Sequence, residues 1–183
     1  FESDDNFLLI AIENDKTVFQ EKFLKKFHEF TLEAISLPHI ISSQSLTSIS
    51  YPVKTPFGIT TIPVIHIENP ELYVFDSIRL MEDTRFKNNL INSSATALVV
   101  NLKTKDEISI SEAEELIDDL REMLRKYEFE DFHILGRAYF QCELVRNQKK
   151  EILISGIVSV LLVSFIMMLL YRKWIGVVIA LFS

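Results

Sequence analysis

The sequence predicts an α+β fold for residues 1–150, followed by α-helices that cross a membrane. Two observations lead to this prediction. Two parts of the first 150 residues each show the pattern of a strand, a helix and a second strand. After residue 151 the chain turns apolar and contains no further acidic residue. The length suits one soluble domain joined to membrane segments.

The first strand–helix–strand unit is expected within residues 7–48. Residues 7–13 (FLLIAIE) are an apolar run between polar neighbours, which is typical of a buried strand. Residues 16–34 have apolar side chains at helical spacing, and Asp15 is a suitable N-cap. Residues 39–48 read as the second strand. The phenylalanines of the helix are predicted to lie in the core rather than to line a ligand site: Phe19, Phe23, Phe27 and Phe30.

An insertion is predicted at residues 49–93. It is irregular, and Pro and Gly residues interrupt it repeatedly. We expect an extended arm over residues 59–67 and helical turns at 71–81 and 84–89. Asp76 and Arg79 are spaced to pair across one helical turn. Exposed apolar residues of the insertion could form a binding patch, with packing of the loop as the alternative: Tyr51, Pro56 and Phe57.

The second unit follows the insertion. Residues 96–103 (TALVVNLK) predict a strand, and residues 109–127 predict a helix with a capping box formed by Ser111 and Glu114. Residues 132–135 predict the last strand. From Ala138 the helical pattern continues into the apolar segment without a helix breaker. Two such units form a ferredoxin-like α+β sandwich of split βαβ units, with the insertion between the second and third strands.

The membrane prediction rests on residues 152–170, a run of 19 residues without a charge. A helix of this length spans roughly 28 Å, close to the hydrocarbon thickness of a bilayer. A buried core helix is the alternative, but soluble cores rarely need a helix that is apolar on every face. We therefore expect a transmembrane helix at 151–171, a loop at 172–174 and the start of the next transmembrane helix at 175–183. A short buried tail is the alternative for that last segment.

The loop between the two apolar segments predicts the orientation. Arg172 and Lys173 favour the cytoplasmic side, and Tyr171 and Trp174 favour the membrane interface. Residues 1–150 are then extracytoplasmic, in a multi-pass protein of the cytoplasmic (inner) membrane. Because no signal peptide is visible, we expect an earlier transmembrane helix to precede Phe1 and to export the domain. Ser155 and Ser159 would let a neighbouring helix approach closely.

The charge balance excludes several partners. All 26 acidic residues precede Ile152, as do 17 of the 19 basic residues, so residues 1–151 carry a net charge of −9. Such a domain is a poor nucleic-acid binder and a poor ligand for anionic lipid head groups. The single cysteine, Cys142, excludes an internal disulfide and a multi-cysteine zinc site.

No catalytic, cofactor-binding or metal-binding residue is predicted, and an enzyme is not expected. The four glycines are not clustered as in a nucleotide-binding loop. The histidines lack metal-ligand spacing and are interpreted as surface or strand-edge residues: His28, His39, His66 and His133. The acidic pair Asp4-Asp5 is interpreted as the solvated start of a strand. The acidic run at 112–119 is interpreted as a solvated helix face.

Three stretches carry a resemblance to a known family. They are FESDDNFLLIAIEN at 1–14, DSIRLMEDTRFKNNLINSSATALVVNL at 76–102 and HILGRAYF at 133–140. In layout the whole chain resembles the first extracytoplasmic loop and following helices of a resistance-nodulation-division (RND) superfamily exporter, in the hydrophobe-exporter branch that includes the mycobacterial membrane protein large (MMPL) proteins. Gly136-Arg-Ala138 departs from the Gly-x-Pro that this family often has after its fourth strand.

The resemblance implies a porter-type domain within a proton-driven efflux protein. Its substrates would be hydrophobic or lipid-like, and its partners would be the bilayer, the remaining transmembrane helices and, as an open possibility, further copies of the protein. The acidic proton-relay residue of such exporters lies in their fourth membrane helix, so no residue here takes that role. Two alternatives stay open: an ATP-driven permease subunit and a ligand-binding sensor ectodomain. The second apolar run at 175–182 counts against the sensor.

Overall fold

A computed structural model describes residues 6–56, 58–106 and 108–171. The chain divides into two compact units, residues 1–142 and residues 143–183. The elements, in chain order, are β1 (Phe7–Glu13), α1 (Glu21–Ala34), β2 (Ile40–Ser45), β3 (Ser50–Thr55), β4 (Gly58–Pro63), η1 (Pro70–Leu72), α2 (Tyr73–Glu82), β5 (Ala97–Thr104), α3 (Ile110–Lys126), β6 (Phe132–Gly136) and α4 (Arg137–Tyr171).

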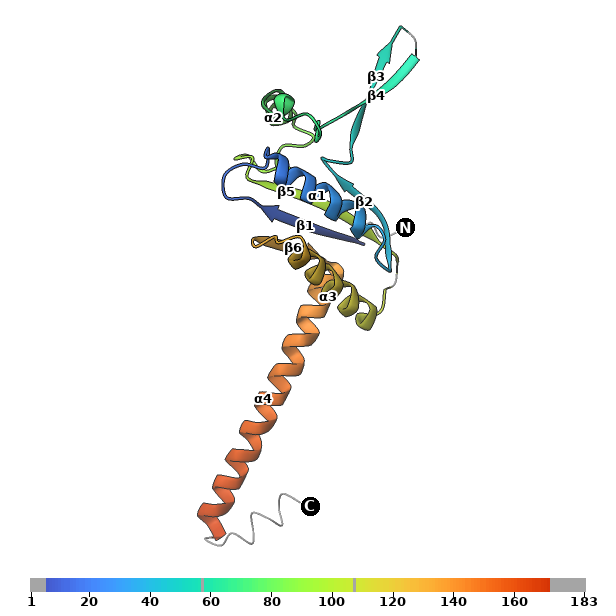
Figure 1. Ribbon diagram of the computed structural model, residues 1–183. Helices are drawn as coiled ribbons and strands as arrows, with labels where there is room; N and C mark the ends of the chain where they lie inside the picture. The colour runs from blue at the N-terminus through green and yellow to red at the C-terminus, as the bar shows by residue number, and fades with distance from the viewer. Residues whose placement is uncertain (1–5, 57, 107, 172–183) are drawn as a thin grey trace. The chain divides into compact units, whose positions relative to one another are not determined.

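Four strands form an antiparallel sheet in the order β2-β5-β1-β6 (Figure 1). Strand β5 lies between β1 and β2, and strand β1 lies between β5 and β6. Each strand–helix–strand unit is therefore split by one strand of the other unit. The α+β class predicted from the sequence is confirmed, and all four strands of this sheet fall where their apolar patterns place them.

One face of the sheet carries the core. Alternate residues of β1 are buried, as expected where one face of a strand is covered: Leu8, Ile10 and Ile12. In β5 the buried alternates are Leu98, Val100 and Leu102. Helices α1 and α3 cover this face (Figure 1). The prediction that the four phenylalanines are core residues is confirmed. Phe23, Phe27 and Phe30 of α1 are buried, and Phe19, before α1, is partly buried and packs against the core.

Helix α1 begins at Glu21, five residues later than the sequence pattern predicts, and Asp15 does not cap it. The reason lies in the preceding residues, which are bound to the loop before β5. The backbone N–H of Val18 donates to the carbonyl of Ala95 at 2.9 Å, and the Thr17 hydroxyl donates to the same oxygen at 3.2 Å. These bonds hold residues 17–18 out of the helix.

Helix α3 has a capping box, but it lies two residues before the predicted one. Ser109 Oγ accepts a hydrogen bond from the backbone N–H of Glu112, and Glu112 Oε2 accepts one from the backbone N–H of Ser109. Both Ser109 and Ser111 have a glutamate three residues later, so spacing alone could not distinguish them. The extended backbone of Ser109, with φ −67° and ψ 159°, makes it the N-cap.

The insertion is more regular than the sequence predicts. Strands β3 and β4 form an antiparallel hairpin, in which Pro52 pairs with Thr61. Because proline is rare in strands, the sequence pattern did not predict β3, although proline is tolerated on an edge strand. The helix predicted at 84–89 is wrong. This segment is a series of turns that includes Asn88 in a left-handed conformation with φ 65°.

Gly136 ends β6 and immediately precedes α4. Its φ of 152° lies in a region that side chains rarely adopt, and a Cβ at this position would overlap the carbonyl oxygen of Phe7. Glycine is therefore required where β6 pairs with the start of β1. Helix α4 then continues from Arg137 through Tyr171, which agrees with the uninterrupted helical pattern of the sequence.

Candidate functional site

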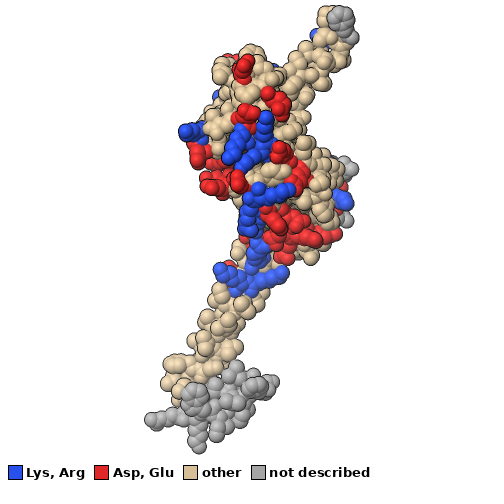
Figure 2. Space-filling view, in the orientation of Figure 1, with Lys and Arg blue, Asp and Glu red and all other residues tan. Residues whose placement is uncertain are grey.

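Helix α4 is the feature with the most direct functional meaning. Among the described residues it is the one helix long and apolar enough to cross a membrane, and its most apolar window has a mean hydropathy of 2.8. None of that window is buried. Large apolar side chains are exposed along it, for example Ile152, Leu161 and Leu169. Figure 2 shows this part of α4 as a rod without charged side chains. Such a helix needs an apolar environment on every side.

The small residues of α4 are open to a neighbour. Ser155 and Ser159 are exposed, and a Cβ added at Gly156 would meet no atom within 4 Å. Close approach of a second helix at these positions is thus sterically possible. The loop at 172–174 and the second apolar segment at 175–183 lie outside the described residues. The predictions made for them therefore stay predictions.

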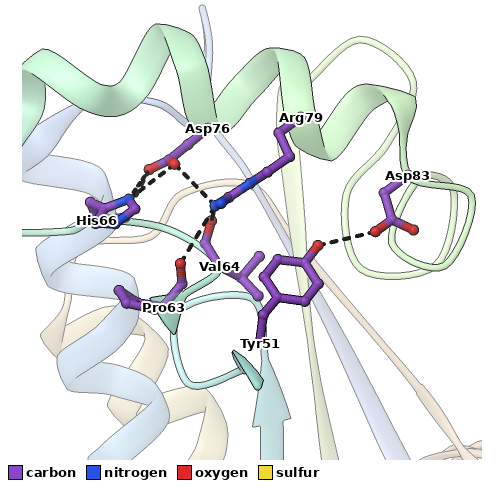
Figure 3. A network of polar contacts seen from close by, with 7 residues as sticks. All are labelled: Tyr51, Pro63, Val64, His66, Asp76, Arg79 and Asp83. Carbon is purple, nitrogen blue, oxygen red and sulfur yellow. Dashed lines mark hydrogen bonds and ion pairs between the residues drawn. The ribbon is translucent and has the colours of Figure 1, made fainter. Parts of the chain in front are cut away.

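Asp76 organises the polar part of the insertion (Figure 3). It lies in α2, and its side chain is fully buried. Its Oδ2 accepts a hydrogen bond from the backbone N–H of His66 at 2.8 Å, and its Oδ1 lies 3.0 Å from His66 Nδ1. The predicted pair with Arg79 is present, with 3.1 Å between Nη2 and Oδ1. A buried carboxylate of this kind needs several hydrogen bonds to offset its desolvation.

Arg79 links α2 to the end of the hairpin. Its Nη2 donates to the carbonyl oxygen of Val64 at 2.5 Å. Its guanidinium also lies over the ring of Tyr51, 5.3 Å from the centroid, and over the ring of Phe75 at 5.7 Å. These are favourable cation–π distances. Arg79 thus joins α2, β3 and the segment after β4.

A second carboxylate completes the network. Asp83 follows α2 and accepts a hydrogen bond from the Tyr51 hydroxyl at 3.0 Å. Arg85 Nη2 donates to Asp83 Oδ2 at 2.7 Å, and Arg85 Nε donates to Oδ1 at 3.0 Å. The Arg85 guanidinium holds the pKa of Asp83 well below its usual range. Burial, followed by the hydrogen bond to Asp83, raises the pKa of Tyr51. We call Tyr51, His66, Asp76, Arg79 and Asp83 the insertion clamp.

The exposed side of α2 is apolar. This short helix buries Tyr73, Leu80 and the charged Asp76, and it exposes further large apolar side chains, which an ordinary surface helix does not. The exposed residues on or next to it are Leu72, Val74, Phe75 and Ile78. Contiguous exposed apolar residues are a common mark of an interaction surface. Tyr51, by contrast, is half-buried against Phe86, with ring centroids 5.8 Å apart.

The geometry of the clamp favours a structural role over catalysis. Both oxygens of Asp76 are engaged by His66 and Arg79, and its side chain is fully buried, so the carboxylate offers no accessible oxygen to a substrate. Within the described residues no group of three or more His, Cys, Asp or Glu side chains could hold a metal ion. His66, expected at the surface or a strand edge, instead contacts a buried aspartate. Its spacing in the sequence gave no sign of this contact.

The remaining candidate residues lie apart from the clamp. His39 Nε2 is 3.9 Å from Glu112, and His133 Nε2 is 3.8 Å from Glu13. His28 lies on α1. Its Nδ1 is buried and forms no hydrogen bond with any other residue that the structure describes. In the acidic run of α3, Glu112 serves the capping box. The pair Asp4-Asp5 lies outside the described residues.

The sequence was compared with models of protein families and with curated proteins. The sequence matches no model of a known protein family, and a search of curated proteins finds no match to it.

Proposed function

We propose that the chain is part of a proton-motive-force-driven membrane exporter of the RND superfamily, in the hydrophobe-exporter, MMPL-like branch. Its soluble domain would capture or pass a hydrophobic or lipid-like substrate. One observation carries the proposal: an antiparallel sheet of two interleaved strand–helix–strand units is followed directly by a helix with 19 uncharged residues. The interleaved order supports a ferredoxin-like, split βαβ domain of the porter type.

The proposal includes a topology, with residues 1–150 outside and the 172–174 loop inside the cytoplasmic membrane. Basic residues also flank the other end of the apolar run, at Arg146, Lys149 and Lys150. The orientation in the membrane, however, depends mainly on the basic residues of short loops, because long domains are translocated largely regardless of their charge. The short loop with Arg172 and Lys173 is therefore the informative one. In a multi-pass protein, further spans would cover the apolar surface of α4.

Cysteine accessibility tests this topology in intact cells. Cys142 is buried and would first be replaced by alanine, followed by single substitutions Lys54→Cys and Lys173→Cys. Lys54 is exposed on β3. We expect a membrane-impermeant maleimide to label Lys54→Cys in intact spheroplasts and to label Lys173→Cys only after permeabilisation. The opposite pattern would place the domain in the cytoplasm and would remove the exporter topology.

The coding sequence around this chain separates the exporter from its rivals. The proposal expects a helix before Phe1, further spans after residue 183 with an acidic residue inside one of them, and a second soluble domain. An end after one or two further spans would favour an ATP-driven permease subunit. A polar signalling module after Lys173 would favour a sensor.

A further inference from the structure

The face of the sheet opposite the core contains a row of side chains that changes from apolar to polar. Leu9 of β1 pairs directly with Leu135 of β6 on one side and with Asn101 of β5 on the other. Asn101 in turn pairs with Gln44 of β2. Directly paired residues of neighbouring strands point to the same face. The row therefore reads Leu135, Leu9, Asn101, Gln44 across all four strands.

The polar end of this row lies in a pocket. Its volume is about 470 Å³, within the usual range for small-molecule sites. The turns after α2 form its other wall, and they are fixed beside the start of β5 because the backbone N–H of Val99 donates to the carbonyl of Leu90 at 2.9 Å. The residues that line the pocket are Leu9, Gln44, Arg85, Phe86, Asn89, Leu90 and Asn101.

Asn101 supplies the observation that points to a ligand. Its Oδ1 is buried and accepts no hydrogen bond from any residue that the structure describes. A buried, unpaired carbonyl oxygen costs about 1–3 kcal/mol, so buried polar groups are nearly always paired. A hydroxyl or N–H group of a molecule bound in the pocket would remove this cost once the amide turned its Oδ1 outward. Gln44 and Asn89 add two more side-chain amides to the same pocket.

The electrostatics of the pocket favour an uncharged group. Arg85 is the one charged side chain among the lining residues, and its guanidinium is already neutralised by Asp83 at 2.7 Å. Neither a free carboxylate nor an unpaired cation faces the pocket from these residues. Amides pair well with hydroxyl groups, which both donate and accept hydrogen bonds. At the other end of the row, Leu9 and Leu135 are 37% and 67% exposed and offer an apolar surface.

We propose that this pocket binds the uncharged, hydroxyl-bearing head of an amphipathic molecule whose apolar chain lies over Leu9 and Leu135. When the head binds, the Asn101 amide turns its Oδ1 toward the pocket and accepts a hydrogen bond from the head. This inference deepens the proposed function, on which it rests, because it gives the soluble domain a defined place for a lipid-like substrate. A free fatty acid fits less well, since its carboxylate would find no unpaired cation in the pocket.

Photolabelling of the full chain in phosphatidylcholine nanodiscs tests the proposal. The probe is 1-lauroylglycerol with a diazirine in the acyl chain, and the labelled peptides are mapped by mass spectrometry. We expect label on peptides that contain residues 7–13 and 85–101, with competition by unlabelled 1-lauroylglycerol but not by lauric acid. Asn101→Leu should reduce this labelling about fivefold, the loss expected for one neutral hydrogen bond. Asn147→Leu, the same change at an exposed position of α4, should leave it unchanged.

Three results would overturn the proposal: equal labelling of wild type and Asn101→Leu, labelling confined to residues 152–170, or equal competition by lauric acid. If Asn101→Leu fails to fold, as judged by circular dichroism, Gln44→Leu carries the same prediction. The result is independent of transport. An unlabelled pocket in a protein that exports would remove only this site, whereas a labelled pocket without export would remove only the proposed function.

Discussion

The Tyr127 hydroxyl donates a hydrogen bond to Glu33 Oε2 at 2.7 Å, joining the C-terminal end of α3 to α1. Lys126 donates to the same carboxylate, with its Nζ 2.6 Å from Oε1. The two core helices, 94 residues apart in the chain at this contact, are thus linked by one carboxylate. The hydrogen bond from Tyr127 favours the neutral phenol, and the carboxylate beside it opposes a second negative charge.

This contact predicts that Tyr127 loses its proton at a higher pH than an ordinary tyrosine. The hydrogen bond to Glu33 raises the pKa of Tyr127 to about 12, above the ordinary value of about 10. Because the pKa is raised on folding, the stabilisation is fully present below about pH 10 and is lost as the pH rises toward 12. The change Glu33→Gln should return Tyr127 toward the ordinary value. Tyrosinate absorbance, taken as a difference between each protein and its Tyr127→Phe variant, measures this shift. An unchanged titration in Glu33→Gln would contradict the assignment.

The clamp at Asp76 predicts a local loss of stability. Asp76→Ala removes the acceptor for the His66 backbone N–H and leaves Arg79 without its carboxylate, so we expect a loss of about 3 kcal/mol. The effect should appear as faster hydrogen exchange of residues 64–83, measured by mass spectrometry on the full chain. Asp76→Asn keeps an oxygen acceptor and should cost less. Unchanged exchange in Asp76→Ala would show that the insertion is held in another way.

The second carboxylate of the clamp predicts an acid sensitivity. The pKa of Asp83 is lowered mainly by the hydrogen bonds that it accepts from Arg85. The ionised carboxylate therefore stabilises the fold fully at any pH above the ordinary pKa of an aspartate, and this stabilisation is lost as the pH falls below that value. The decline should begin from about pH 4 downward. The protection of residues 50–63 against hydrogen exchange, corrected for the pH dependence of the intrinsic exchange rate, should fall over this range in wild type. In Asp83→Asn this protection should be low already at neutral pH. Parallel profiles for the two proteins would refute this role.

The junction between β6 and α4 predicts a strict requirement for glycine. Gly136→Ala places a Cβ against the carbonyl oxygen of Phe7 and against Leu8, in a conformation that is itself strained by roughly 1–3 kcal/mol. We expect a loss of about 3 kcal/mol or more and a sharply reduced yield of folded protein. Gly156→Ala is the matched control, because a Cβ there meets no atom within 4 Å. The yield of folded protein by size-exclusion chromatography would decide, and equal yields would contradict the prediction.

Local pattern was enough to predict most of the fold. The strands predicted at 7–13 and 96–103, the helix predicted at 109–127 and the helical pattern that continues from Ala138 each depend on neighbouring residues, and the structure has these elements. The errors arose where distant residues decide the structure. Ala95 keeps residues 17–18 out of α1, and pairing with β4 makes a strand of a proline-containing segment.

The site was far less predictable than the fold. The Asp76–Arg79 pair lies within one helical turn and could be read from spacing. His66 belongs to a loop, and its contact with Asp76 depends on how the insertion folds back on itself. The polar row through Asn101 and Gln44 depends on strand register, which no short pattern encodes.

The most direct test of the central claim is the energy source of transport. The full-length protein that contains this chain would be reconstituted in liposomes, and export of a fluorescent acylglycerol would be measured under an imposed proton gradient without ATP. We predict export that starts with the gradient and stops when an uncoupler dissipates it. Export that requires ATP and ignores the gradient would contradict the account and favour an ATP-driven permease, and no export under either condition would leave a sensor as the better description.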